Sequence, residues 1–139
     1  MEPVKQVDSL GCGVACVAYI LKARYQKSIR FFANGRKKAK ATGFLCKEIV
    51  AALDRADLKY EYKYIKCGIK SRIYLPGTIV FLGRSRKYPK GHYLVRSDNN
   101  EWMDPWINFP SEPISAGFRL RLPERPIYAI FPTKERVGS

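Results

Sequence analysis

Two stretches near the amino terminus carry apolar residues at a helical period. The first runs from Cys12 to about Arg24, where apolar residues are nearly continuous, and it predicts a helix that is buried on most sides. The second has the sequence FLCKEIVAALDRADL and follows Thr42 and Gly43. We therefore predict a helical amino-terminal half with the first of these helices at its centre.

The sequence between these two helices is more polar. Ser28 is a suitable N-cap for a short helix, SIRFFA, which we expect to end near Asn34 and Gly35. The basic run RKKAKA that follows is predicted to be a loop.

After Leu58 the pattern changes to alternation. In KYEYKYIK the residues Tyr60, Tyr62 and Tyr64 fall on one face and charged residues on the other, which predicts a half-buried strand. The polar SDNN stretch is of the kind that closes an antiparallel hairpin between the strands on its two sides. Five further short strands are expected, separated by Pro, Gly or Asn: TIVFL (78–82), GHYLVRS (91–97), EWMD (101–104), FRLRL (118–122) and IYAIF (127–131).

Helices followed by antiparallel strands are typical of the α+β class. The sequence shows no internal repeat, low-complexity segment or linker, so we expect residues 1–139 to form a single domain. This length is sufficient for a hydrophobic core without disulfides or metal. The expected fold has amino-terminal helices, with a central buried helix packed on an antiparallel sheet.

Composition and charge narrow the class of partner. The chain has 26 Lys and Arg against 12 Asp and Glu, and its net charge of +14 favours an acidic partner: nucleic acid, anionic lipid, an acidic peptide or an acidic inhibitor. The sequence contains no run of about 18 apolar residues, so we expect no membrane-spanning helix. The start MEPVKQVDS lacks the features of a secretory signal. We therefore expect a cytoplasmic protein, or a domain delivered into a target cell as part of a larger secreted protein.

Cys12 lies between two glycines, where a loop turns into the first apolar helix. A thiol in the first turn of a helix is close to the positive end of the helix dipole and to unpaired N–H groups, which favour the thiolate. The alternative is that Cys12 is a small buried residue, as we expect for Cys16 and Cys46. We place Cys67 at a strand end, and we expect all four thiols to be reduced.

A nucleophilic thiolate needs a base, and His92 is the only histidine of the chain. The SDNN hairpin would bring Asp104 back toward His92, where its carboxylate could orient the imidazole. Cysteine, histidine and aspartate in this chain order form a thiol hydrolase triad. The Cys12 backbone N–H and the Gln6 side chain are candidate donors to an oxyanion. The alternatives are a structural histidine, an Asp-Pro turn that ends a strand, and a solvated surface glutamine.

Several segments together resemble a known family. They are QVDSLGCGVACVAYILK, TGFLCKEIVAAL, LPGTIVFL, GHYLV and the Asp-Pro pair, and they resemble the papain-like cysteine peptidases that trim double-glycine leader peptides. In that family such domains lie at the amino terminus of bacteriocin-exporting ABC transporters. The resemblance extends from about Gln6 to Pro105. Its specific parts are the Gln-to-Cys spacing and the Cys-Gly, Gly-His and Asp-Pro pairs.

The resemblance implies a papain-like fold and a role for each candidate residue. Gln6 would donate to the oxyanion, Cys12 would be the nucleophile, His92 the base and Asp104 the orienting carboxylate. No cofactor or metal is implied, and no role is assigned to the segment from Trp106 to Ser139. The leading hypothesis is therefore a cysteine hydrolase that cleaves a peptide or protein substrate through a thioester acyl-enzyme.

Other functions remain open at this point. The same triad also catalyses deamidation and acyl transfer. A second hypothesis is a delivered bacterial toxin or effector that is neutralised by an acidic immunity protein. A third is a basic nucleic-acid-binding module without catalysis, which is disfavoured because the basic residues are scattered and no nucleic-acid motif is present. A zinc site made of Cys12, Cys16 and His92 lacks a second ligand pair.

A basic segment, RSRKYPKGHY, precedes the histidine. If His92 lies at the mouth of a cleft, these cations give the rim a positive potential that attracts an acidic peptide or inhibitor. The alternative is a solvated basic loop that serves solubility. The candidate partner-binding residues are Arg84, Arg86, Lys87 and Lys90.

Overall fold

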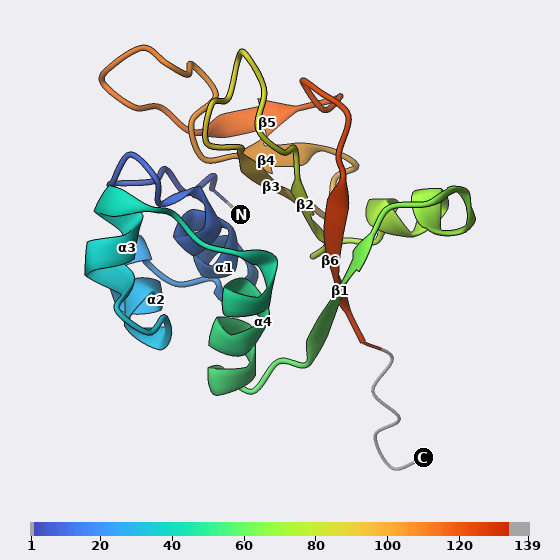
Figure 1. Cartoon of the computed structure of the whole chain (residues 1–139), viewed down its shortest axis with the longest axis horizontal. Helices are drawn as coiled ribbons and strands as arrows, with labels where there is room; N and C mark the ends of the chain where they lie inside the picture. The colour runs from blue at the N-terminus through green and yellow to red at the C-terminus, as the bar shows by residue number, and fades with distance from the viewer. Residues whose placement is uncertain (1, 134–139) are drawn as a thin grey trace.

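The structure is a computed structural model that describes residues 2–133, apart from the side chains of residues 67–69. Helices α1 to α4 lie on one side of a sheet, and a 3₁₀ helix, η2, lies on the other side (Figure 1). The helices are α1 (Cys12–Leu21), α2 (Tyr25–Ser28), η1 (Ile29–Phe31), α3 (Gly35–Ala41), α4 (Cys46–Arg55) and η2 (Cys67–Tyr74). The strands are β1 (Tyr60–Tyr64), β2 (Ile79–Phe81), β3 (Tyr93–Arg96), β4 (Trp102–Asp104), β5 (Gly117–Arg119) and β6 (Tyr128–Pro132).

Within residues 2–133 the sheet has six strands in the order β1-β6-β2-β3-β4-β5, and every neighbouring pair is antiparallel. The strands on the two sides of SDNN pair as predicted, with Arg96 opposite Trp102. Only β6 lies out of sequence order, because it is inserted between β1 and β2. The predicted α+β fold with an antiparallel sheet is therefore confirmed.

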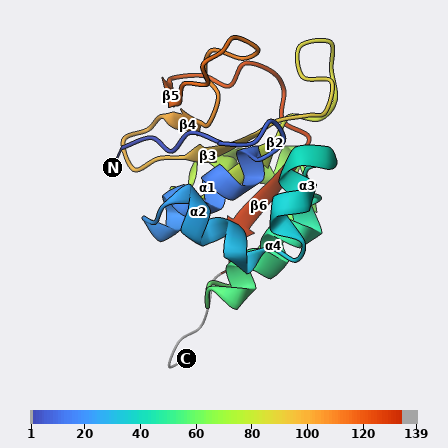
Figure 2. The same ribbon diagram turned by 90° about the vertical axis from the view of Figure 1, so that its left-hand side faces the viewer.

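Helix α1 is the central helix of the domain. Its residues from Cys12 to Ala18 are all buried, and it contacts α2, α4 and β3. In the turned view α2 lies over α1, with the sheet on the far side (Figure 2). The helix ends at Leu21, three residues before the predicted limit, because Lys22 adopts a left-handed conformation with φ of 54°. The predicted buried central helix is confirmed.

The loop predicted before α4 is wrong. The basic run RKKAKA is not a loop, because it belongs to helix α3. Lysine, arginine and alanine have high helix propensity, and the buried Ala39 anchors the helix to the core while Arg36, Lys37 and Lys40 face solvent. Ser28 holds the predicted N-cap position, before the 3₁₀ helix η1, but it is also the last residue of α2 and its side chain makes no capping hydrogen bond.

The tyrosine face of β1 is more exposed than predicted. Tyr60 is half-buried and its hydroxyl donates to the Gly77 carbonyl at 3.0 Å, but Tyr62 and Tyr64 are 44% and 56% exposed. β1 is an edge strand, and the rings of Tyr62 and Tyr64 both contact the ring of Tyr128 on its neighbour β6. The prediction that Cys67 ends a strand is also wrong, because its backbone begins the 3₁₀ helix η2.

The sheet is covered by apolar side chains on both faces. The face toward α1 and α4 forms the main core, and a second cluster that includes Val80, Leu94, Trp102 and Phe131 packs under Ile73 of η2. No helix within residues 2–133 combines the length and the apolar character needed to cross a bilayer.

Candidate active site

Cys12 is the first residue of α1 and is 9% exposed, in the wall of a cavity of about 770 Å³. The two flanking glycines are explained by close packing. A Cβ on Gly11 would lie 2.0 Å from the Tyr25 hydroxyl, and a Cβ on Gly13 would lie 3.0 Å from Ile49 Cδ1. The glycines therefore let the start of the helix sit deep against its neighbours, with the thiol at the edge of the cavity.

The β3–β4 hairpin brings His92 and Asp104 together. His92 immediately precedes β3, and Asp104 is the last residue of β4. His92 Nε2 lies 2.7 Å from Asp104 Oδ1, and the two residues are 3% and 0% exposed. The other ring nitrogen, Nδ1, is not bonded to Asp104, and Cys12 is close enough to the imidazole to raise the pKa of His92.

The surroundings of His92 and Asp104 favour the charged forms of both side chains. Burial by itself would lower the pKa of His92, but hydrogen bonds to Asp104 and Cys12 and the charges of these residues raise it to about 9. Burial also opposes ionisation of Asp104, but His92, Arg119 and the Trp106 N–H together lower the pKa of its carboxyl. At neutral pH the imidazole is therefore protonated and the carboxyl is ionised.

Gln6 is also part of the cluster and is only 1% exposed. Its Nε2 donates to the carbonyls of Asp8 and Ser9 at 2.9 and 3.0 Å, and its Oε1 has no partner among the described residues. Gln6 lines the same cavity as Cys12 and His92. To donate to an oxyanion, its amide must exchange one of these two bonds.

Three residues of the cluster were missed in the sequence. Arg119 Nε donates to Asp104 Oδ2 at 2.7 Å, and the backbone N–H of Trp106 donates to Asp104 Oδ1 at 3.0 Å. The Tyr88 ring stacks on His92 with a centroid distance of 4.6 Å and an interplanar angle of 8°. In sequence, Arg119 and Arg121 are equivalent positions of one strand pattern, so no local signal separates them.

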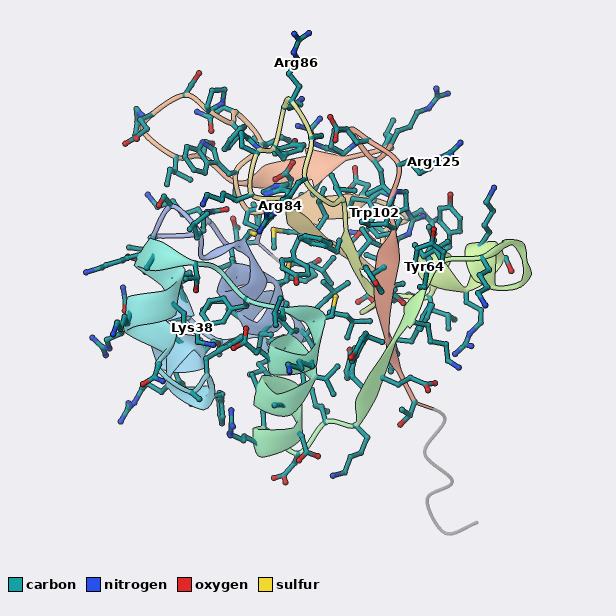
Figure 3. The ribbon with its side chains drawn as sticks, viewed as in Figure 1. Lys38, Tyr64, Arg84, Arg86, Trp102 and Arg125 are labelled. Carbon is teal, nitrogen blue, oxygen red and sulfur yellow. The ribbon has the colours of Figure 1, made fainter. Side chains whose placement is uncertain are left out.

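The basic loop before His92 contributes unequally to the cavity. Arg84 and Lys90 line it, whereas Arg86 and Lys87 are not among the lining residues. Figure 3 shows Arg86 at the tip of the loop, pointing away from the body of the molecule. A third cation of the lining, Lys38, is paired with Glu48. Within residues 2–133, Arg84 and Lys90 are therefore the unpaired basic side chains of this wall.

The cysteines other than Cys12 are placed differently. Cys16 is fully buried, and burial and the charges of Cys12 and Asp104 raise the pKa of its thiol. Burial also raises the pKa of Cys46, whose sulfur lies 3.8 Å from the Tyr93 hydroxyl. The side chain of Cys67 lies outside the described part. Among the described residues, no three His, Cys, Asp or Glu side chains are grouped to hold a metal ion, so the zinc alternative gains no support.

Comparison with solved structures identifies the architecture. The peptidase domain of Streptococcus ComA, a bifunctional ABC transporter of a quorum-sensing pathway, matches with a TM-score of 0.58 and 19% identity, over 94% of this chain and 96% of that one. A double-glycine-motif protease from an AMS/PCAT transporter, solved in complex with the leader peptide, matches with a TM-score of 0.52 and 16% identity, over 95% and 91%. The chain has the double-glycine peptidase fold.

The double-glycine peptidase fold confirms the resemblance that was inferred from the sequence. It also extends that resemblance, which stopped at Pro105, because the structural matches cover nearly the whole chain. No protein-family profile and no curated protein matches the sequence. The likeness is therefore one of fold.

Proposed function

We propose that this protein is a cysteine peptidase that uses Cys12, His92 and Asp104 as its catalytic triad. The observation that carries the proposal is the buried His92–Asp104 pair, at 2.7 Å, beside a thiol at the first residue of a helix. The double-glycine peptidase fold supports it, because the matched structures are peptidase domains. A triad of this kind is recognised by its geometry and roles.

The proposed reaction begins from a thiolate–imidazolium pair, which the raised pKa of His92 favours. The Cys12 thiolate attacks the peptide carbonyl carbon, and the carbonyl π electrons move to the oxygen. The Cys12 backbone N–H and the Gln6 amide, after exchange of one of its bonds, donate to this oxyanion. The tetrahedral intermediate then collapses to a thioester while His92 protonates the leaving amine.

Hydrolysis of the thioester completes the cycle. His92, now neutral, accepts a proton from water, and the resulting hydroxide adds to the thioester carbonyl. Collapse of this second intermediate releases the acid and restores the thiolate–imidazolium pair. The same thioester would transfer its acyl group to an amine, or arise from a side-chain amide, so product masses separate peptidase, transferase and deamidase activity.

Selective alkylation of Cys12 is the direct test of the proposed nucleophile. We expect iodoacetamide at neutral pH to modify Cys12 faster than the other three thiols, since only Cys12 combines a helix start with a neighbouring imidazolium. Cys46 is the internal control, because it is also the first residue of a helix but has no histidine beside it. Peptide mapping after partial labelling gives the four rates. Equal rates in the folded protein would contradict a catalytic Cys12.

We further propose a peptide substrate with acidic side chains near the cleavage site. Arg84 and Lys90 line the cavity and form no ion pair with a described residue, so they give this wall a positive potential. An acidic inhibitor protein would meet the same two cations. Of the four candidate partner-binding residues in the basic loop, this proposal keeps Arg84 and Lys90.

Charge reversal at Arg84 and Lys90 tests the proposed preference for an acidic substrate. Arg84→Glu with Lys90→Glu should lower kcat/KM toward an acidic peptide by about tenfold at low salt, because steering of a charged ligand is lost. The difference should shrink as salt rises through about 0.15 M, where the screening length is about 8 Å. The control Arg125→Glu,Arg121→Glu changes the net charge equally at two exposed positions that do not line the cavity. Equal losses in both double variants, or no salt dependence, would refute a local role.

A further inference from the structure

We infer that Arg119 is a positioning residue, which holds the Asp104 carboxylate in the orientation that His92 needs. The inference rests on the proposed triad. It adds a residue from β5, in the segment to which the sequence assigned no role. Nothing in the Gln6-to-Cys12, Gly-His or Asp-Pro signatures points to it.

The hydrogen bonds of Asp104 show what Arg119 contributes. Asp104 is fully buried, and its Oδ1 accepts from His92 Nε2 at 2.7 Å and from the Trp106 N–H at 3.0 Å. Its Oδ2 accepts from Arg119 Nε at 2.7 Å, which is the only bond to this oxygen among the described residues. Without Arg119, a buried carboxylate oxygen is left unpaired, a state that costs free energy and favours rotation or protonation of the group.

Arg119 is itself held in place by the sheet. Asp104 lies opposite Gly117 across the β4–β5 ladder, so Arg119 is the diagonal neighbour on the same face. Gly117 has no side chain, and the Ile107 side chain packs where one would lie, with its Cδ1 2.9 Å from the position of a Cβ. A second bond, from Arg119 Nη2 to the Ile107 carbonyl at 3.2 Å, fixes the guanidinium from the other side. One planar group thus connects the carboxylate to the backbone.

Arg119 also affects the ionisation of Asp104. Its hydrogen bond is one of the causes that lower the pKa of Asp104, after the bond and charge of His92. The carboxylate therefore remains an acceptor for the imidazole over a wider pH range. The hydrogen bonds of Arg119 among the described residues go to Asp104 and Ile107, not to the thiol or the imidazole, so its effect on the reaction passes through Asp104.

The test uses the fact that His92 is the only histidine of the chain. In ¹⁵N-labelled protein its ring N–H signals are therefore assigned without ambiguity. We expect a far-downfield, slowly exchanging Nε2 proton in the wild type, because it is buried and bonded to a carboxylate. In Arg119→Gln this signal should broaden through solvent exchange, and kcat on a cleaved peptide should fall about 10²-fold with KM little changed. The matched control is Arg121→Gln, on an exposed side chain two residues away, which should match the wild type.

The outcomes are separable. A wild-type Nε2 signal and kcat in folded Arg119→Gln, even with lowered thermal stability, would show a purely structural role and overturn the inference. If Arg119→Gln does not fold, Arg119→Lys is the deciding variant. Lysine keeps the charge but cannot bond Asp104 and the Ile107 carbonyl as the planar guanidinium does, so kcat should lie between wild type and background. Full wild-type kcat would overturn the inference. If no peptide is cleaved by the wild type, the iodoacetamide rate of Cys12 replaces kcat. The Nε2 signal and this rate then test the positioning role, whereas the absence of cleavage contradicts the proposed peptidase function separately.

Discussion

Cys12→Ala should abolish peptide cleavage and leave the fold intact. The substitution removes the sulfur that forms the thioester, and loss of a triad nucleophile costs about 10⁶-fold in kcat. The change deletes one atom at the edge of an existing cavity, so we expect little loss of packing and a thermal midpoint close to that of the wild type. Cleavage of a peptide followed by mass spectrometry, together with a thermal melt, measures both quantities.

Cys46→Ala is the matched control for this variant. Cys46 is also the first residue of its helix and is partly buried, but its sulfur contacts Tyr93 and no histidine. We expect this variant to keep wild-type turnover. A Cys12→Ala protein that unfolds, or one that still cleaves peptide at the wild-type rate, would show that Cys12 is a packing residue.

Asp104→Asn should lower kcat by about 10⁴-fold, the loss seen when the orienting carboxylate of such a triad becomes an amide. The amide keeps the size of the side chain but no longer accepts two charge-assisted bonds, from His92 and Arg119. Alkylation of Cys12 should persist at a reduced rate, since Asp104 does not form the bond. Asp98→Asn, at the exposed hairpin turn, is the control and should keep the wild-type kcat.

The same variant should change how stability depends on pH. The pKa of His92 is about 9 in the folded protein against an ordinary value of 6.5, so the folded state binds this proton more tightly than the unfolded chain does. The resulting stabilisation is complete below pH 6.5 and is lost as the pH rises through about 9. In Asp104→Asn the pKa of His92 falls, so urea midpoints should decline less steeply across this window. An unchanged slope would show that Asp104 does not hold the imidazolium.

The parts of the site that the sequence could reveal are joined by short, local structure. Gln6 and Cys12 are connected by one loop, and His92 and Asp104 by one hairpin whose SDNN turn is readable. Once the period-two pattern sets the register, the imidazole and the carboxylate must meet. Local signals therefore predict the placement of these four side chains well.

The missed features depend on contacts between distant segments. Tyr88 and Arg119 reach the His92–Asp104 pair from a loop and from β5, and neither position has a distinctive pattern. Helix α3 was predicted as a loop because its sequence is almost entirely polar and its two buried residues, Gly35 and Ala39, give no apolar periodicity. The tyrosines of β1 alternate as a half-buried strand should, but an edge position leaves two of them exposed.

The place of β6 in the sheet determines when the domain can be completed during synthesis. β1 and β2 leave the ribosome well before β6, yet each of them pairs with it. Until then both present open backbone edges, which are prone to mispairing. Such distant pairing also makes for slow folding, since a long loop must close before the contacts form. Arg119 arrives late as well, so Cys12 is translated long before the sheet that positions His92 and Asp104 is complete.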